Sequence, residues 1–234
     1  MAQAHARATD DRQAAPETPS QPEEAREPRR GARGLLRELR PAILLTLVLT
    51  ALLGVAYPLA TMGLAQALFP AQANGSIVYQ NGHAIGSQLI GEYWTQPQYF
   101  HGRPSATVNA AGAPSPYNAS NSGASNLGPT NKALAQTVSQ RIAQLKRDNP
   151  DVPAGTPIPV DLVTSSGSGL DPDISVAAAY YQIPRVAKAR GLSQAAVRHI
   201  VDAHITGRFL GVFGEPVVNV LDVNLALDAV TAHA

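Results

Sequence analysis

The sequence contains no cysteine, few aromatic residues and little net charge. Without cysteine, the 234-residue chain forms no disulfide, no thiolate zinc site and no thiol nucleophile. The net charge is +1, which gives no reason to expect nucleic acid or a strongly acidic partner. Aromatic residues make up 5%, a low fraction for a protein with large aromatic binding platforms. Because these absences exclude functions without predicting one, the information lies in how residues are distributed.

A more informative absence is local: residues 42 to 69 include no Asp, Glu, Lys, Arg or His. A membrane-spanning helix needs about 20 mainly apolar residues, and this run is longer. The apolar part of a secretory signal is only about 7–15 residues long and is followed by a cleavage site of small residues. We therefore expect an uncleaved membrane helix within residues 35–70, which also include an Arg-rich flank.

Charges beside the run predict its orientation. On the C-terminal side no formal charge occurs before Glu92, whereas the N-terminal side is basic and only Glu38 opposes it. Since Lys and Arg are retained on the cytoplasmic side, we expect a cytoplasmic N-terminus and an extracytoplasmic C-terminal part. The arginines concerned are Arg29, Arg30, Arg33, Arg37 and Arg40.

Small residues and one proline stand out within the run. Pro58 should kink or loosen the helix because it lacks an amide N–H. Small side chains allow a second helix to pack closely in a membrane. The predicted packing positions are Gly54, Pro58, Ala60 and Gly63.

Residues 1–34 are polar, rich in Ala, Pro, Glu and Arg, and show no hydrophobic period. Such a segment cannot bury enough apolar surface to offset its ordering entropy. We expect a disordered cytoplasmic tail, with a docking role as the alternative.

Residues 71–234 predict one α+β domain. Helical and β-type apolar patterns are mixed there without βαβ repetition. The long stretch 101–130 is dominated by small, polar and turn-forming residues, so it is either functional or disordered. The predicted strands are 77–79, 88–93, 158–164 and 217–223. The predicted helices are 130–149, 174–190, one from 192 onward, and 225–230. We expect Thr130 or Asn131 to cap the first of these helices, and Pro184 to break or kink the second.

Tests for catalytic motifs give no convincing site. The Ser-Ser-Gly-Ser-Gly run at 165–169 lacks the Lys and Ser/Thr of a P-loop, so a tight turn is favoured. An anchored extracytoplasmic hydrolase would use Ser166 or Ser168 with His204 as base, but the Gly-x-Ser-x-Gly pattern is absent. His199 and His204 are five residues apart, which is not the spacing of a helical zinc pair.

Two acidic residues precede the helix predicted from residue 174. Asp171 and Asp173 flank Pro172 and could hold a cation, although capping of that helix is the favoured interpretation. No metal site is predicted.

Several ordered blocks after residue 70 resemble the KdpC family, the C subunit of Kdp-type potassium-transporting P-type ATPases. One of them, Ser-Gly-Ala-Ser-Asn-Leu, differs from the family's Ser-Gly-Gly-Ser-Asn-Leu only at Ala124. The resemblance extends over about residues 35–230. The main blocks are 72–76, 86–91, 99–106, 122–129, 160–172, 182–190, 214–221 and 225–228.

The resemblance implies a non-catalytic accessory subunit of a high-affinity, ATP-driven potassium uptake complex in the bacterial inner membrane. The implied partners are a channel-like potassium-binding subunit, a P-type ATPase subunit, a small single-helix subunit and the lipid bilayer, with no nucleic acid. The implied role is assembly, together with a chaperone function that raises the ATP affinity of the ATPase subunit. ATP would be shared with that subunit, and K⁺ would be the transported ion without a site evident in this chain.

The resemblance also implies that the extracytoplasmic domain lies near the potassium entrance of the channel-like subunit. Asp171 and Asp173, if exposed there, would raise the local potassium concentration. Arg103 and Arg185 are expected to be internal staples or partner contacts. A pilin-like structural subunit is a further alternative, but no processing site precedes the apolar run. The candidate contacts are His101, Arg103, Ser125, Asn126, Asp171, Asp173 and Arg185.

Overall fold

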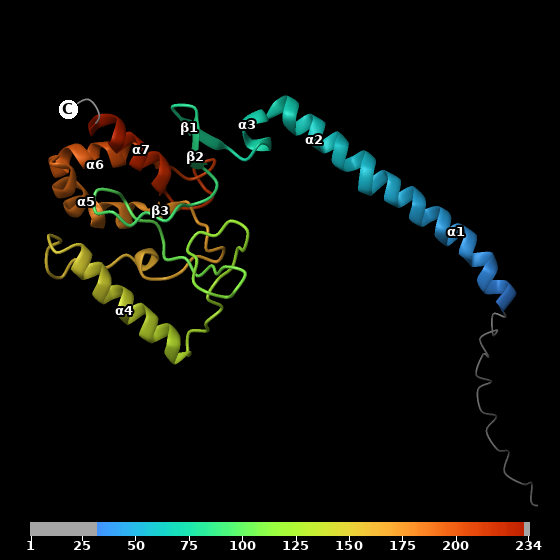
Figure 1. Ribbon diagram of the computed structural model, residues 1–234, viewed down its shortest axis with the longest axis horizontal. Helices are drawn as coiled ribbons and strands as arrows, with labels where there is room; N and C mark the ends of the chain where they lie inside the picture. Colours follow the sequence, from blue (N-terminus) through green and yellow to red (C-terminus); the bar gives the residue numbers. More distant parts are fainter. Residues whose placement is uncertain (1–31, 232–234) are drawn as a thin grey trace, which may run out of the picture. The chain divides into compact units, whose positions relative to one another are not determined.

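A computed structural model describes residues 32–231 of the chain. It divides between Leu59 and Ala60 into two units, each of which has its own internal contacts (Figure 1). The tail predicted over 1–34 lies outside the described residues, except for its last three residues, which already belong to a helix.

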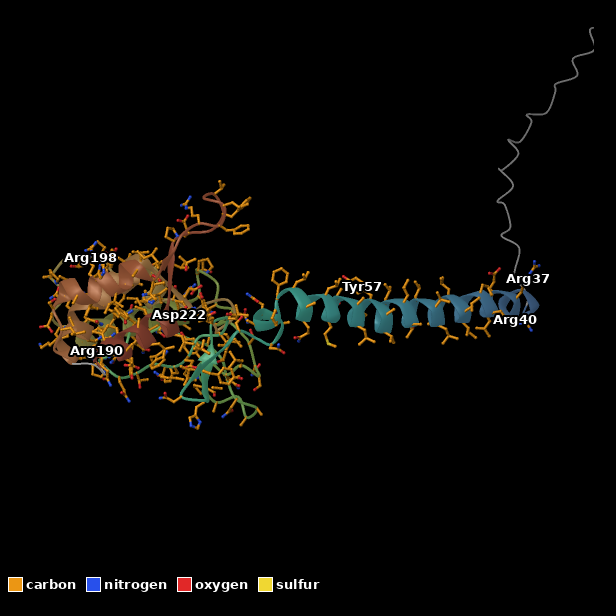
Figure 2. The ribbon with its side chains drawn as sticks, turned by 90° about the horizontal axis from the view of Figure 1, so that it is seen from above. Arg37, Arg40, Tyr57, Arg190, Arg198 and Asp222 are labelled. Carbon is orange, nitrogen blue, oxygen red and sulfur yellow. The ribbon has the colours of Figure 1, made fainter. Side chains whose placement is uncertain are left out.

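The first unit consists of an apolar helix, which continues into the second. It is made of α1 (Ala32–Ala51), a π-helical turn (Leu52–Ala56) and α2 (Tyr57–Leu68). Within Arg37–Leu68, the most apolar stretch of 18 residues has a mean hydropathy of 2.2, and none of this stretch is buried. Its 32 residues span about 48 Å at 1.5 Å per residue, enough to cross a bilayer. Arg37 and Arg40 lie near its N-terminal end (Figure 2).

The π-helical turn is where the sequence predicts Pro58 to disturb the helix. Pro58 has no N–H to donate to the carbonyl of Gly54, and its ring crowds that carbonyl. The turn immediately before it widens, so that the Tyr57 N–H donates to the carbonyl of Leu52, five residues back. The prediction of local loosening is therefore confirmed, and the helix continues without a break.

The second unit begins with a short helix, α3 (Pro70–Ala73), and a hairpin of β1 (Ile77–Gln80) and β2 (His83–Ser87). Asn81 and Gly82 form the hairpin turn with φ of +51° and +81°, which favours these two residue types. The prediction of a strand over 88–93 is wrong: after the turn, residues 83–87 form the strand that pairs with β1.

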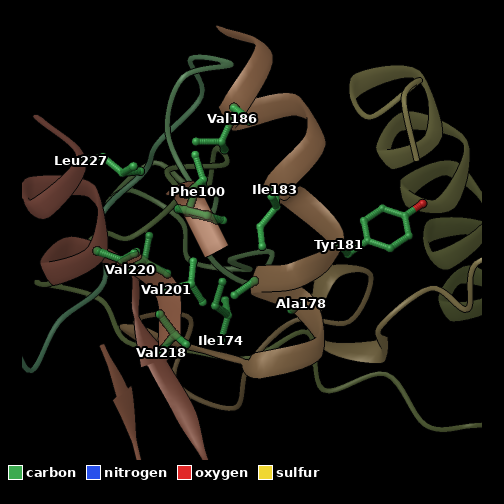
Figure 3. Packing of buried hydrophobic residues seen from close by; sticks show 14 of the residues in the cluster. Phe100, Ile174, Ala178, Tyr181, Ile183, Val186, Val201, Val218, Val220 and Leu227 are labelled. Atoms are coloured by element: carbon green, nitrogen blue, oxygen red, sulfur yellow. The ribbon is translucent and has the colours of Figure 1, made fainter. Parts of the chain in front are cut away.

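A three-stranded antiparallel sheet is the centre of the domain. Its order is β3 (Asp173–Ser175), β5 (Val217–Asn219), β4 (Ile205–Thr206). Helices α5 (Val176–Arg190), α6 (Gln194–Ala203) and α7 (Val220–Thr231) contribute to the core with it. Figure 3 shows this cluster, in which Phe100 lies among residues of α5 and α7. The side chains below 2% exposure include Phe100, Ile174, Val186, Val197, Val201, Val218, Val223 and Leu227.

Several predicted boundaries need correction. Residues 158–164 form no strand: Val160–Leu162 is a 3₁₀ turn. The strand predicted over 217–223 ends at Asn219, whose side chain accepts the N–H of Asp222 and so starts α7 early. Ile174 belongs to β3, and the next helix is capped by Ser175, not by Asp171 or Asp173. That helix runs through Pro184 without a break.

Two helices agree with their sequence signals. Helix α4 (Lys132–Asp148) is capped by Asn131, whose side chain accepts the N–H of Ala133, and it ends at Asn149. Helix α6 is capped by Ser193 and buries Val197 and Val201. One face of α4 is apolar and half-buried, and it consists of Leu134, Val138, Ile142 and Leu145.

Residues 97–101 belong to no helix or strand, yet each of their carbonyls accepts a hydrogen bond from a helix side chain. Asn224 of α7 bonds both the N–H and the C=O of Phe100, at 2.8 and 3.0 Å. Gln182 of α5 does the same for His101, at 2.8 and 3.1 Å. Two arginines of α5 bond the remaining three carbonyls. These side chains satisfy backbone groups that no helix or sheet of the domain pairs.

The long stretch 101–130 has no helix or strand but is held by short polar side chains. Thr107, 3% exposed, donates to the carbonyl of Ser115 at 2.5 Å, and Ser105 donates to the carbonyl of Gly169 at 2.7 Å. Gly169 has φ +69°, and a Cβ there would lie 2.6 Å from the carbonyl oxygen of Gly123. The predicted turn at 165–169 thus requires its final glycine.

We predict that Asn224→Leu lowers the free energy of unfolding by about 2–5 kcal/mol. The substitution leaves the N–H and C=O of Phe100 buried and unpaired while preserving side-chain volume. Denaturant titration of the full chain in detergent measures the loss. Gln140→Leu on the exposed side of α4 is the control, expected within about 0.5 kcal/mol of the parent. Equal stability of Asn224→Leu and the parent would contradict the anchoring role.

Candidate functional site

A pocket of about 660 Å³ opens beside the segment that the helix side chains hold. Its wall is formed by α4, α5 and the irregular chain before α4. Three arginines contribute to it, one from each of these three parts: Arg103, Arg141 and Arg185. The aromatic lining consists of Tyr93, Trp94 and Tyr117.

Arg185 is 6% exposed, and its guanidinium group donates hydrogen bonds to groups inside the domain. Its Nη1 donates to the carbonyls of Pro97 and Tyr99, at 2.7 and 3.0 Å. Its Nε donates to Oδ1 of Asn149 and its Nη2 to Oε1 of Gln182. Burial lowers the pKa of Arg185 to about 10, so the guanidinium stays charged at neutral pH. Of the two roles predicted for Arg185, the structure shows the internal one.

Arg103 has partners for its two terminal nitrogens but none for its Nε. Its Nη1 lies 3.0 Å from Oδ2 of Asp171, and its Nη2 donates to the carbonyl of Ser165 at 3.4 Å. The Nε is buried without a hydrogen-bond partner. Tyr117 Oη donates to the carbonyl of Arg103 at 2.7 Å, and burial raises the pKa of this phenol.

Arg141 of α4 reaches the same place from the opposite wall. Its Nη1 donates to the carbonyl of Val163 at 3.2 Å and lies 3.5 Å from Oγ of Ser165. Within residues 32–231, no carboxylate forms a salt bridge with Arg141. Burial lowers the pKa of Arg141. Arg103 and Arg141 therefore converge on one residue, Ser165, and of the two only Arg103 is paired with a carboxylate among residues 32–231.

His101 is neutral in this environment. Burial, and then the positive charge of Arg185, lower its pKa to about 4. Its Nε2 lies 3.0 Å from the carbonyl oxygen of Gln96 and 3.3 Å from Nη1 of Arg185. The charge of the pocket wall at neutral pH therefore comes from the arginines, together with the exposed carboxylate of Asp148. Such a wall can bind and orient an acceptor group.

The structure brings four predicted site residues together: His101 and Arg185 in one contact, Arg103 and Asp171 in another. Asp173 lies two residues from Asp171 on β3 and accepts a hydrogen bond from Asn219. Burial, and secondarily Asp171, raise the pKa of Asp173.

The other predicted residues lie elsewhere. Ser125 and Asn126 are exposed in the long irregular stretch, with Asn126 at φ +52°. The predicted membrane packing positions are exposed along the apolar helix: Gly54, Pro58, Ala60 and Gly63.

The serines and the histidine of the hydrolase alternative form hydrogen bonds with residues close to them in the sequence. Ser166 accepts the N–H of Gly169, and Ser168 accepts that of Leu170. His204 Nδ1 lies 2.8 Å from the carbonyl oxygen of Ile200. No hydrogen bond joins His204 to either serine in the described part of the chain, so this arrangement offers no activated nucleophile.

Sequence reasoning missed an exposed apolar hairpin between β4 and β5. Four large side chains at its tip are 64–76% exposed: Phe209, Leu210, Val212 and Phe213. The tip is closed by backbone hydrogen bonds between Phe209 and Phe213, and Arg208 pairs with Glu215 at its base, 2.7 Å apart. The signal was present, since two of the chain's four phenylalanines fall between turn-forming glycines.

Arg141 and Trp94 were also missed. Arg141 lies within a helix of polar character, where an arginine is normally solvated. Trp94 is the chain's single tryptophan, yet no motif surrounds it. Only the folded arrangement places both in one wall.

Comparison with known proteins places the chain among potassium-transport subunits. The family model described as "K+-transporting ATPase, c chain" matches residues 39–229. The potassium-transporting ATPase KdpC subunit of Bradyrhizobium diazoefficiens is 54% identical over 204 residues, covering 85% of this chain and 100% of the relative. The subunit of the same name from Rhodopseudomonas palustris strain BisB18 is 56% identical over 201 residues, covering 83% and 99%. The chain therefore belongs to the KdpC family.

Proposed function

We propose that this chain is a non-catalytic accessory subunit that holds together the channel-like and P-type ATPase subunits of an ATP-driven potassium uptake complex. A small single-helix subunit would complete the assembly. The observation that carries the proposal is the family match over residues 39–229, with relatives named as subunits of a potassium-transporting ATPase. Potassium would be carried by the channel-like subunit, and ATP would be hydrolysed by the ATPase subunit.

The proposed orientation places the N-terminus in the cytoplasm and the domain outside the inner membrane. It is supported by the arginines before the apolar helix and by the absence of formal charge after it as far as Glu92. In this orientation only residues before the helix meet cytoplasmic ATP. A chaperone effect on ATP affinity would therefore act through that segment or through the membrane helices, not through direct ATP binding by the domain.

The apolar hairpin tip at 209–213 is the proposed contact with a partner subunit. Burying a large apolar side chain contributes about 1.5–3 kcal/mol, so four exposed ones form a substantial binding surface. The tip is defined before binding, because its backbone bonds and the Arg208–Glu215 pair hold it closed.

Ser125 and Asn126, which are exposed, remain proposed contacts near the potassium entrance. Asp171 is paired with Arg103, so it would attract potassium less than a free carboxylate would. His101, Arg103 and Arg185 would act by positioning the surrounding loop rather than by direct contact.

A topology test uses the absence of cysteine in the chain. Gln140→Cys, in exposed α4, is expected to react with a membrane-impermeant maleimide in intact spheroplasts. Thr18→Cys is expected to react only after permeabilisation, and the parent chain gives no background. The reverse labelling pattern would overturn the proposed orientation.

An assembly test uses the full chain with a C-terminal tag, co-expressed with its neighbouring subunits and purified in mild detergent. We expect a P-type ATPase and a large channel-like protein to co-purify in fixed ratio. Phe209→Ser combined with Phe213→Ser should reduce that recovery about tenfold or more, as for a lost interface hot spot. Val160→Ser, at an exposed residue outside the hairpin, is the control.

The possible results separate two claims. If the parent chain is recovered alone, under conditions that preserve other membrane complexes, the accessory-subunit proposal is wrong. If the double variant assembles as well as the parent, only the role of the hairpin is wrong.

A further inference from the structure

The arginines of the pocket wall outnumber the carboxylates beside them: Arg103, Arg141 and Arg185 stand against Asp148 of the wall and Asp171, the partner of Arg103. Arg103 has Asp171 as partner, whereas Arg141 has no carboxylate partner among residues 32–231. Both guanidinium groups reach Ser165, one to its carbonyl at 3.4 Å and the other to its hydroxyl at 3.5 Å. Two like charges held this close repel each other, and an anion between them would relieve that repulsion.

The same wall contains two buried donors without acceptors. The Nε of Arg103 and the Nε1 of Trp94 have no hydrogen-bond partner. Leaving a buried donor unpaired costs about 1–3 kcal/mol. Both nitrogens are closed off from solvent, so an acceptor reaches them only if neighbouring side chains move. The free energy recovered by pairing them favours that movement.

We propose that this pocket binds an oxyanion, a carboxylate or phosphate group, between Arg103 and Arg141 and beside Trp94. A guanidinium presents planar paired donors that match both groups, and neither arginine can accept a hydrogen bond. Neutral His101 adds no charge that would oppose or replace this role. The site is separate from potassium transport, because its wall favours anions over cations.

The size of the pocket indicates what carries the anionic group. About 660 Å³ lies within the range of small-molecule sites and greatly exceeds what one free phosphate fills. Tyr93, Trp94 and Tyr117 provide an aromatic wall for an apolar portion. A small organic acid and a phospholipid headgroup both present this chemistry, and the experiment distinguishes them.

The single tryptophan makes the site directly observable. Trp94 lines the pocket and packs against Tyr99, with ring centroids 4.5 Å apart and ring planes at 51°, so its fluorescence reports on this wall alone. The full chain in neutral detergent is titrated with inorganic phosphate and with citrate, while chloride keeps ionic strength constant. We expect a saturable fluorescence change with at least one probe. Nanodiscs containing phosphatidylglycerol, compared with phosphatidylcholine, test the headgroup source.

Two substitutions locate the response. Arg141→Gln should raise the midpoint concentration about tenfold or more, whereas Arg141→Lys, which keeps the charge, should raise it less. Arg198→Gln is the matched control, since Arg198 lies on α6 near Tyr180 and outside the pocket. Thermal unfolding of each variant shows whether its fold is retained.

Each outcome bears on the proposal. A saturable response to phosphate or citrate that Arg141→Gln weakens supports a soluble anion as ligand. A response only to phosphatidylglycerol, again weakened by Arg141→Gln, supports a lipid headgroup. No saturable response to any probe, or one that Arg141→Gln and the parent share equally, overturns the proposal. None of these results depends on whether the chain assembles with a potassium transporter.

Discussion

The domain depends on helix side chains that hydrogen-bond the backbone of residues 97–101. Residues 97–101 pass from an exposed turn into the core at Phe100 without joining a sheet, so the backbone groups that become buried need other partners. Asn224 and Gln182 each bond an N–H and a C=O of one residue, and Arg185 and Arg190 bond three further carbonyls. Because these bonds fix the backbone, Phe100 can fill the core at 0% exposure.

The pocket follows from the same constraint. His101 is the last of the anchored residues and Arg103 follows two positions later, and Arg185 supplies both an anchor and part of the pocket wall. Helix α4 closes the opposite side with Arg141. Segments far apart in the sequence thus meet at one place, and they include three of the blocks that resemble the KdpC family, 99–106, 160–172 and 182–190. Within these blocks Arg103 pairs with Asp171, whereas Arg185 bonds carbonyls and amide side chains of the surrounding fold.

Sequence reasoning succeeded where the signal is local. The charge-free run predicted the apolar helix, Pro58 predicted its irregularity, and Asn131 predicted the start of α4. It failed for short strands, since β3, β4 and β5 have only two or three residues each and their pairing depends on distant partners. It also failed to pair Arg103 with Asp171 or Asn224 with Phe100, because such contacts join residues 68 and 124 positions apart. The fold class was predictable and the pocket was not, whereas the exposed hairpin left a local signal, two phenylalanines between glycines, that was not recognised.

Amide hydrogen exchange of Phe100 and His101 tests the anchoring most directly. Amides in an irregular segment normally exchange quickly, through local opening. If Asn224 and Gln182 hold this segment as part of the core, both amides should exchange as slowly as that of Val218 in the central strand β5, in the full chain in detergent. Exchange of either amide at the rate of an exposed loop residue such as Ala119 would contradict the account, because the segment would then open independently of the core.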